Sequence, residues 1–505
     1  MIAARMSTPG DFNTRAHRWL MLALFGQLFL LWSLPLTSSL WLDETVTWWM
    51  ASGSLETLWQ RGTEFSGGSP VPWLLPWASM KLFGTSEWAL RLPSLLCMAG
   101  AVLVVAAIGR RLFDRGTGLC AAAVFAFHHV VHFEARNARA YALAMLGAAL
   151  ATLALLRWLE RPGLLRALAY GACVALTVLA HFMFGGILIV HAAWVVIFRG
   201  VRGPRWSVGE AAALLFATLA GIAPALVLLS GVSARAPGLM VSGVPYIEAL
   251  LRELAPHATV ASALTGLLVL GMMGRMRRDP VAPPLARPTL LALALLFLLP
   301  PIALFVASRW TPWQIFLPRY ASWHAIGLAL LVGWCWRQVA GQGSRIILAA
   351  ILFAMGSGAF LTRSHFVNEW RGVSEAVSVE LERHPGAPLL AHTGLIESLD
   401  ASFVRDPEKS AYLLAPFAAY PVPSGHELKA LTWNAHTPDA QAYVEELALW
   451  LEREHTAFVL VSRDTSEPGF WPFFRGRLGP LSWKDHRLDN IRGNMIAVVF
   501  EKTRH

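Results

Sequence analysis

The sequence has few charged residues and few cysteines. Charged side chains make up 15% of the 505 residues, hydrophobic residues make up 55%, and the mean hydropathy is +0.49. The core of a soluble protein cannot bury that much apolar surface, so a soluble globular protein is excluded. The four cysteines all fall in apolar stretches: Cys97, Cys120, Cys173 and Cys335. They match neither a disulfide framework nor a zinc pattern, and we expect buried thiols.

Several other sequence signals are missing. There is no internal repeat, no low-complexity linker and no glycine-rich phosphate loop in the C-terminal part, so a nucleotide site is not expected there. The first apolar run leads through Pro35-Leu36-Thr37 into Trp41 without a small-residue cleavage site. We therefore expect this run to be a retained signal anchor.

Long apolar runs recur from Trp19 to about Thr362. Each is about 17 to 25 residues long, enough for a helix to cross a hydrocarbon layer. The stretch from Pro70 to Phe83 is only about 14 residues long and carries three prolines, which indicates an interfacial or re-entrant segment. The expected fold is a polytopic α-helical membrane protein with about eleven spans. They are residues 19–36, 89–108, 117–133, 141–157, 167–182, 183–198, 209–230, 257–273, 289–307, 321–336 and 346–362.

The net charge of +10 comes from arginines that lie between these runs. By the positive-inside rule such clusters mark cytoplasmic loops, so the charge orients the chain and requires no nucleic-acid partner. The N-terminus, residues 1–18, is then cytoplasmic and the C-terminus lies outside the cell membrane. The main clusters include Arg15 and Arg18, Arg110 and Arg111, Arg157 and Arg161, Arg199 and Arg202, Arg277 and Arg278, and Arg337 and Arg345.

The region from residue 363 to 505 reads as a small extracytoplasmic α/β domain. Helical periodicity covers Phe366 to His384 and Tyr443 to Leu451. Short apolar runs predict buried strands at residues 388–392, 457–462 and 495–501. A domain of roughly 140 residues is long enough for its own core. The aromatic tract from Pro468 to Trp483 is either a contact with the membrane or acceptor, or a packed loop.

Unusual polar residues gather at the outer side of the transmembrane domain, residues 19–362. Asp43 and Glu44 lie among tryptophans in the first outer loop, residues 37–88, where carboxylates gain nothing unless they bind, pair or exchange protons. The other members of the set are Glu134, Arg136, Arg139, His181, Arg309, Arg319 and Tyr320.

Each of these residues also has a simpler interpretation. Arg136 and Arg139 could extend to lipid headgroups, and His181 could be a hydrogen-bonded core histidine. His128, His129 and His132 have spacing that would allow metal contacts, but no carboxylate motif accompanies them. The convergence of carboxylates and arginines on one membrane face favours a functional site.

A lipid-phosphate sugar in the outer leaflet would need these residue types. Arginines would bind the phosphate by charge-assisted hydrogen bonds and stabilise it as it leaves. A carboxylate near the anomeric carbon would accept the proton of an incoming hydroxyl. A phosphate leaves without a proton donor, so one base and a set of cations suffice, unlike the carboxyl pair of glycosidases.

Five segments, in this order, resemble the family 39 branch of the GT-C glycosyltransferases, which includes protein O-mannosyltransferases and aminoarabinose transferases. The resemblance extends over residues 19–362. The segments are Trp41-Leu42-Asp43-Glu44, Glu87-Trp88-Ala89-Leu90-Arg91-Leu92-Pro93-Ser94, Ala138-Arg139-Ala140-Tyr141-Ala142-Leu143, His181-Phe182 and Pro318-Arg319-Tyr320.

The resemblance implies an inverting transfer of a sugar from a polyprenyl-phosphate donor to a lipid, glycan or protein acceptor, at the outer face of the inner (plasma) membrane. It implies catalytic roles for Asp43 and Glu44. The donor phosphate would be bound by Arg139, Arg136, Arg319 and Arg91, with Glu134, Tyr141, His181 and Tyr320 in support. The family often has His-Pro-Pro where this chain has Ser69-Pro70-Val71-Pro72, and Glu where it has Asn137. These departures leave the donor sugar and the use of a divalent metal open.

Two other functions remain from sequence alone. A transporter or flippase for the same lipid would also hold outer-leaflet arginines, but it would be expected to show polar or broken helices at mid-membrane. A noncatalytic scaffold presenting the C-terminal domain would not require Asp43 and Glu44 beside several arginines.

Overall fold

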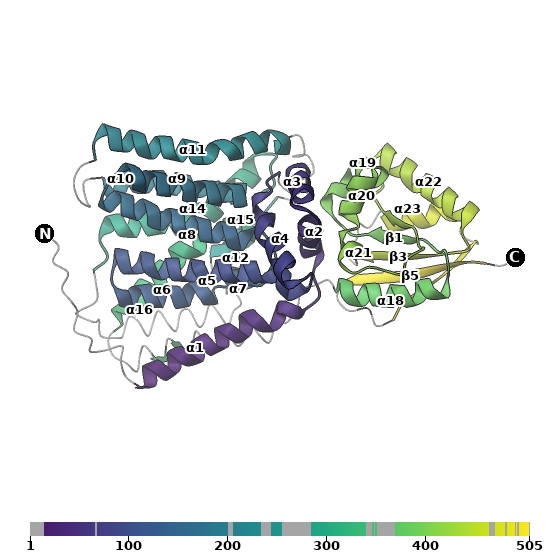
Figure 1. Cartoon of the computed structure of the whole chain (residues 1–505), viewed down its shortest axis with the longest axis horizontal. Helices are drawn as coiled ribbons and strands as arrows, with labels where there is room; N and C mark the ends of the chain where they lie inside the picture. Colours follow the sequence, from purple (N-terminus) through teal and green to yellow (C-terminus); the bar gives the residue numbers. More distant parts are fainter. Residues whose placement is uncertain are drawn as a thin grey trace.

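The computed structural model shows a bundle of long helices followed by a part built on a β-sheet (Figure 1). The structure describes residues 15–65, 68–199, 206–233, 244–254, 284–339, 346–347, 349–350, 369–463, 470–479, 482–489, 491 and 494–503. The expected span at 257–273 lies outside these residues, and so does nearly all of the one at 346–362.

The helices of the bundle follow the apolar runs of the sequence. Four of them are long and apolar enough to cross a membrane, and two bent helix pairs raise this number to six among the described residues. The expected number of eleven therefore stays a prediction. The helices are α1 (Arg15–Ser33), α5 (Glu87–Leu112), α6 (Arg115–Phe127), α7 (His129–Ala135), α8 (Tyr141–Glu160), α9 (Leu164–Ala180), α10 (Ile187–Phe198), α11 (Val208–Ser233), α12 (Ile247–Leu254), α14 (Arg287–Trp310), α15 (Pro318–Ala321) and α16 (His324–Gln338).

Small residues and one polar network hold the bundle together. A Cβ on Gly171 of α9 would lie 2.3 Å from the Ala217 carbonyl oxygen of α11, so only glycine permits this close approach. The buried His191 ring lies 3.1 Å from both the Thr152 and the Tyr170 hydroxyls, which satisfies its two nitrogens.

The first outer loop is folded into short helices between the bundle and the sheet. They are α2 (Leu42–Ala51), α3 (Leu55–Glu64) and α4 (Val71–Phe83), after the 3-10 turn η1 (Leu34–Thr37). The chain bends by 73° between the first helix and α2. At 13 residues, α4 is about 20 Å long, shorter than a membrane span. The interfacial or re-entrant placement of this segment stays a prediction.

The C-terminal part contains a five-stranded sheet in the order β2-β1-β3-β5-β4. Strands β1 (Leu389–His392), β2 (Leu428–Ala430) and β3 (Ala457–Arg463) are parallel, with Leu389 level with Val459. Strand β5 (Met495–Lys502) runs antiparallel to β3 and to β4 (Trp483–Arg487). The helices around the sheet are α18 (Trp370–Arg383), η4 (Ile396–Leu399), α19 (Ser402–Arg405), α20 (Pro407–Leu413), α21 (Ala415–Ala419), α22 (Pro438–Glu454) and α23 (Phe470–Arg477).

The aromatic tract after residue 468 belongs to the interior of this part. Phe470 and Phe474 of α23 are buried, and Phe470 stacks on His392 with ring centroids 4.8 Å apart. Their packing against the sheet favours the packed-segment interpretation over a contact with the membrane.

One hydrophobic core joins the first outer loop to the sheet. Trp49 and Phe65 of the loop contact Tyr412 of α20, with ring centroids 5.7 and 5.1 Å away. The loop helices and the C-terminal part therefore lie on the same side of the bundle, as Figure 1 also shows.

Candidate active site

The two adjacent carboxylates of the first outer loop lie in the first turn of α2. Trp41 precedes this helix in an extended conformation, and its backbone N–H donates to Glu44 Oε2 over 3.3 Å. Negative charge is favourable here because the N-terminal turn exposes unpaired N–H groups. Consecutive helical positions point about 100° apart, so Asp43 and Glu44 face different surroundings.

Glu44 points into the protein and meets Arg91 of α5. Arg91 Nε donates to Glu44 Oε1 over 2.8 Å, and neither side chain is exposed. Arg91 also donates to the carbonyl oxygens of residues 35, 36, 38 and 39, at 2.7 to 3.0 Å. Glu44 Oε1 accepts a further hydrogen bond from the Ala138 backbone over 2.9 Å. The sequence led us to expect a catalytic Glu44 and a phosphate-binding Arg91, but these bonds engage both groups within the protein.

Asp43 points instead to a partly open space between two arginines. Its Oδ2 lies 3.5 Å from Arg319 Nη1 and 4.0 Å from Arg139 Nε, and its carbonyl oxygen accepts from Arg139 Nη1 over 3.1 Å. The exposed fractions of the Asp43, Arg139 and Arg319 side chains are 21%, 16% and 37%. Residues about 100 and 280 positions apart thus form one polar site.

Aromatic rings form the wall beside these arginines. The guanidinium of Arg319 lies 5.9 Å from the Tyr141 ring and 5.8 Å from the Tyr320 ring, within cation–π range. The His181 ring lies 4.9 Å from Tyr141 and 5.1 Å from Tyr320. The structure therefore brings together all three aromatic residues expected to support the site.

Glu134 and Arg136 are buried in the segment just before Arg139. Glu134 accepts from Asn137 Nδ2 over 2.8 Å, and Asn137 Oδ1 accepts from Trp41 Nε1 over 3.0 Å. Arg136 is only 6% exposed. The burial of Arg136 and the contacts of Arg139 with Asp43 favour roles within the protein over extension to lipid headgroups.

Comparison with known proteins supports the resemblance found in the sequence. Residues 68–229 match the sequence model of the dolichyl-phosphate-mannose-protein mannosyltransferase family. The structure is similar to ArnT from Cupriavidus metallidurans in the apo state, with a TM-score of 0.56 and 14% identity over 96% of this chain and 98% of that chain. ArnT bound to undecaprenyl phosphate matches with the same TM-score and identity, over 95% and 98% of the two chains. No curated protein matches.

The chain has the GT-C glycosyltransferase fold. The resemblance to these glycosyltransferases is thus confirmed, and the apolar helices place the chain in a membrane. At 14% identity the ArnT comparison concerns the fold, so the roles of individual residues depend on the geometry of this chain.

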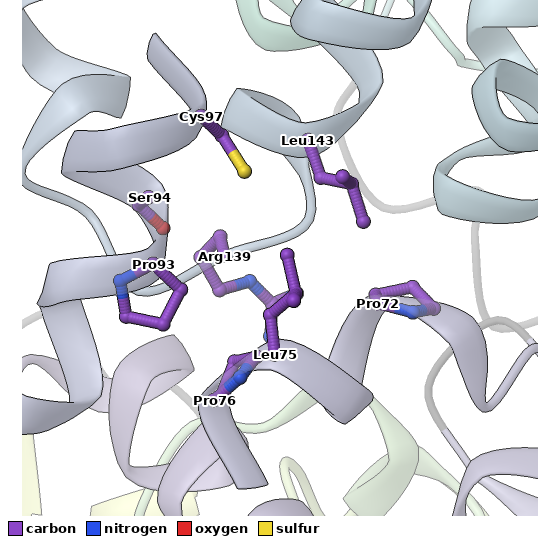
Figure 2. Close-up of a pocket in the computed structure, with 8 residues that line it drawn as sticks. All are labelled: Pro72, Leu75, Pro76, Pro93, Ser94, Cys97, Arg139 and Leu143. Atoms are coloured by element: carbon purple, nitrogen blue, oxygen red, sulfur yellow. The ribbon is translucent and has the colours of Figure 1, made fainter. Parts of the chain in front are cut away.

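A small pocket in this GT-C fold lies beside Arg139 (Figure 2). Arg139 is its only charged lining residue. The other lining residues come from α4, α5 and α8: Pro72, Leu75, Pro76, Pro93, Ser94, Cys97 and Leu143. The pocket thus places the guanidinium of Arg139 among mostly apolar side chains.

The C-terminal part contributes polar groups that the sequence did not single out. Tyr412 donates to Glu397 Oε1 over 2.8 Å. Burial raises the pKa of Glu397 despite this hydrogen bond, and the charge of Asp43 adds to the increase. Arg463, at the end of β3, also interacts electrostatically with Asp43. Glu397 and Arg463 both follow predicted strands, and that position is the signal that could have identified them.

A hydrogen-bond network attaches the C-terminal part to the segment just before Asp43. Glu87 Oε1 accepts from Tyr420 Oη over 2.8 Å and from Arg371 Nε over 3.1 Å. Tyr420 Oη accepts from the Leu40 backbone N–H over 2.8 Å, and Arg371 Nη2 donates to the Thr37 carbonyl over 2.9 Å. The C-terminal part thus helps to position the start of α2.

The expected histidine spacing does not produce a metal centre among the described residues. The His128 ring lies 4.7 Å from His129 and 5.7 Å from His324, but no group of three or more His, Cys, Asp or Glu residues in the described ranges could hold an ion. The site geometry therefore gives no support for assigning metal ligands.

Proposed function

We propose that this chain is an inverting glycosyltransferase that moves a sugar from a polyprenyl-phosphate donor to a lipid, glycan or protein acceptor at the outer face of the plasma membrane. The main support is the position of Asp43, a partly exposed carboxylate 3.5 Å from Arg319 and 4.0 Å from Arg139. The binding of undecaprenyl phosphate by ArnT, which has the same fold, supports a polyprenyl-phosphate ligand.

In this mechanism Asp43 is the general base. It accepts the proton of the acceptor hydroxyl as the hydroxyl oxygen forms a bond to the anomeric carbon. The bond from that carbon to the phosphate oxygen breaks, and the electron pair leaves with the phosphate. Attack on the face opposite the leaving phosphate inverts the anomeric centre.

Arg139 and Arg319 stabilise the departing phosphate. Before the donor binds, Asp43 is the carboxylate that faces both guanidinium groups. The phosphate gains charge as the bond breaks, so positioned cations lower the transition-state free energy more than that of the ground state.

The remaining site residues hold this arrangement. Glu44 and Arg91 are better assigned as positioning residues than as catalytic or phosphate-binding groups, because their bonds are made inside the protein. Glu134 fixes the segment before Arg139 through Asn137. Tyr141, His181 and Tyr320 form the aromatic wall beside Arg319.

The proposal includes the arrangement of the chain in the membrane. Residues 1–18 are cytoplasmic, residues 19–362 form the transmembrane domain, and residues 363–505 lie outside. The shared core supports this arrangement, since α2 and α3 of the outer loop pack against the C-terminal sheet. An extracytoplasmic loop therefore requires an extracytoplasmic C-terminal domain.

The test is complementation of a strain that lacks the gene, followed by mass spectrometry of envelope lipids, polysaccharide and protein for one missing sugar. Asp43→Asn should reduce transfer by about 10² to 10⁴-fold. The purified variant should retain binding of undecaprenyl phosphate. Asp485→Asn, at an exposed carboxylate paired with Arg475, is the control and should restore the sugar. Normal transfer by Asp43→Asn would exclude Asp43 as the base.

A further inference from the structure

The C-terminal sheet has a topological switch point between the carboxyl ends of β1 and β3, the place termed the crevice. Strands β2, β1 and β3 are parallel, and β1 lies between the other two. After β1 the chain goes to β2 on one side of β1, and it then returns to β3 on the other side of β1. In open α/β sheets, ligands bind outside the carboxyl ends of strands where the connections diverge in this way. Here that place lies between Gly394, after β1, and Arg463, at the end of β3.

Gly394 allows the side chain of Arg463 to lie across this crevice. The glycine has φ +74°, and a Cβ there would lie 3.0 Å from Arg463 Cδ and 3.2 Å from its Nη1. Any other residue would be strained and would displace the guanidinium. Glycine at this position therefore permits the close placement of a positive charge over the turn.

Arg463 has unused hydrogen-bonding capacity in this place. Its Nε is buried and has no hydrogen-bond partner among the described residues. A buried donor without a partner has lost its hydration with no compensating hydrogen bond, and the loss is larger when the group is charged. An oxyanion bound in the crevice would supply that hydrogen bond.

The polar side chains at the ends of β1 and β3 beside Arg463, His392 and Ser462, are hydrogen-bonded. His392 Nε2 donates to the Trp433 carbonyl over 2.9 Å, and its Nδ1 lies 3.1 Å from the Ser462 hydroxyl. Burial lowers the pKa of His392, so the ring is neutral near pH 7. Among the described residues of these two strands and the turn after β1, the positive charge at this place is therefore that of Arg463.

The crevice lies on the side of the C-terminal part that packs against α2. Tyr412 contacts Trp49 of α2 and donates to Glu397, three residues after Gly394. Asp43, at the start of the same helix, interacts electrostatically with both Glu397 and Arg463. Arg139 and Arg319, by contrast, come from the helical bundle.

We propose that the crevice between the carboxyl ends of β1 and β3 binds an anionic group of the acceptor, a phosphate or carboxylate, through Arg463. Held there, the acceptor would present a hydroxyl to Asp43 from the side of the C-terminal domain. This inference rests on the proposed function, since it assigns the acceptor side of the same site.

The test uses the full-length protein in phosphatidylcholine nanodiscs, saturated with undecaprenyl phosphate to fill the donor site. Inorganic phosphate is the probe, and calorimetry measures its binding. Wild-type protein should still bind phosphate, and Arg463→Gln should weaken that binding by roughly tenfold to a hundredfold. Arg463→Lys keeps the positive charge but lacks the planar guanidinium with its paired N–H donors, so it should weaken phosphate binding by about threefold.

The matched control is Arg405→Gln. Arg405 lies in the same domain but donates to both carboxylate oxygens of Glu446, at 2.7 and 2.9 Å, so phosphate binding should not change. The crevice assignment is overturned if the donor-saturated wild type binds no phosphate, or if both Arg463 variants bind it as the wild type does. Competition by phosphatidylglycerol in the disc that is lost in Arg463→Gln would support the assignment and indicate a lipid acceptor, whereas competition that persists in both Arg463 variants would overturn it.

The same measurements separate this inference from the proposed function. Undecaprenyl phosphate should bind equally to the wild type and to both Arg463 variants. If phosphate binds through Arg463 but undecaprenyl phosphate does not bind at all, the proposed donor fails while the crevice stands.

Discussion

Arg91 and Glu44 form a fully buried ion pair, in which Arg91 Nε donates to Glu44 Oε1 over 2.8 Å. The pair fixes both halves of the candidate site, because Glu44 adjoins Asp43 and also accepts from the backbone of Ala138, which adjoins Arg139. The two neighbouring carboxylates thus have different roles: Glu44 holds the site in place, and Asp43 faces the space between the two arginines.

Removal of either member of this pair should destabilise the protein. Glu44→Gln or Arg91→Met leaves the partner charge buried without compensation, which costs about 3 to 5 kcal/mol. The double variant should lose less than the sum of the two single changes. Thermal unfolding in detergent measures each loss. Glu160→Gln, which breaks a pair with Arg111 whose side chains are 32% and 34% exposed, should cost at most about 1 kcal/mol. Equal losses in all variants would show that the burial of the Arg91–Glu44 pair does not set the cost.

Arg139→Ala should weaken donor binding more than folding. The change removes one of the two guanidinium groups that face Asp43 and the charged group of the adjacent pocket. We expect the dissociation constant for undecaprenyl phosphate to rise by roughly tenfold or more, with a small change in unfolding temperature. Arg252→Ala, at an exposed arginine of α12 paired with Glu248, is the control. Unaltered affinity in Arg139→Ala would remove Arg139 from the donor site.

The sequence predicted which segments meet at the site better than what each side chain does there. Asp43, Arg139 and Arg319 could be predicted to meet because each lies at the outer end of an apolar run, and alternate membrane crossings bring those ends together. The burial of Glu44 could not be predicted, because the sequence pattern does not show which of two adjacent helical residues faces inward. Arg463 was missed because its place depends on how the sheet packs against α2.

The secondary structure likewise includes elements that the sequence predicts and elements that it does not. The strands at 389–392, 457–463 and 495–502 follow strongly apolar runs that the sequence displays. Strand β2 has only three residues, and β4 exposes four of its five side chains, so neither carries an apolar signal. The expected span at 117–133 is bent by 69° between α6 and α7, at His128, which the apolar pattern alone does not reveal.

Reporter fusions test the proposed placement of the C-terminal domain. Fusions after Arg345 and after Arg363 should report opposite sides of the membrane, because Arg337 and Arg345 form a cytoplasmic cluster and an apolar run separates them from residue 363. A fusion after Arg202 should report the same side as the one after Arg345. A cytoplasmic signal after Arg363 would place the C-terminal domain on the wrong side for the shared core with the outer loop.

Changes in the network that attaches the C-terminal domain should lower turnover without removing a group that contacts the donor. Arg371→Gln breaks the ion pair with Glu87 and the hydrogen bond to the Thr37 carbonyl, and Tyr420→Phe removes both bonds of the Tyr420 hydroxyl. Because these bonds hold the segment before α2, Asp43 should lose its fixed position relative to Arg139 and Arg319.

We expect each of these variants to lower sugar transfer by about tenfold, since each removes one or two hydrogen bonds. The affinity for undecaprenyl phosphate should change by less than about twofold, because Arg139 and Arg319 stay in place. Limited proteolysis should cleave the variants faster near residues 37–41, which a change confined to the donor site would not cause. Arg383→Gln is the matched control, since Arg383 lies on the same helix as Arg371 but is exposed and pairs with Glu380 instead of Glu87. If the control loses as much activity as Arg371→Gln, the loss comes from α18 in general and the network does not position Asp43.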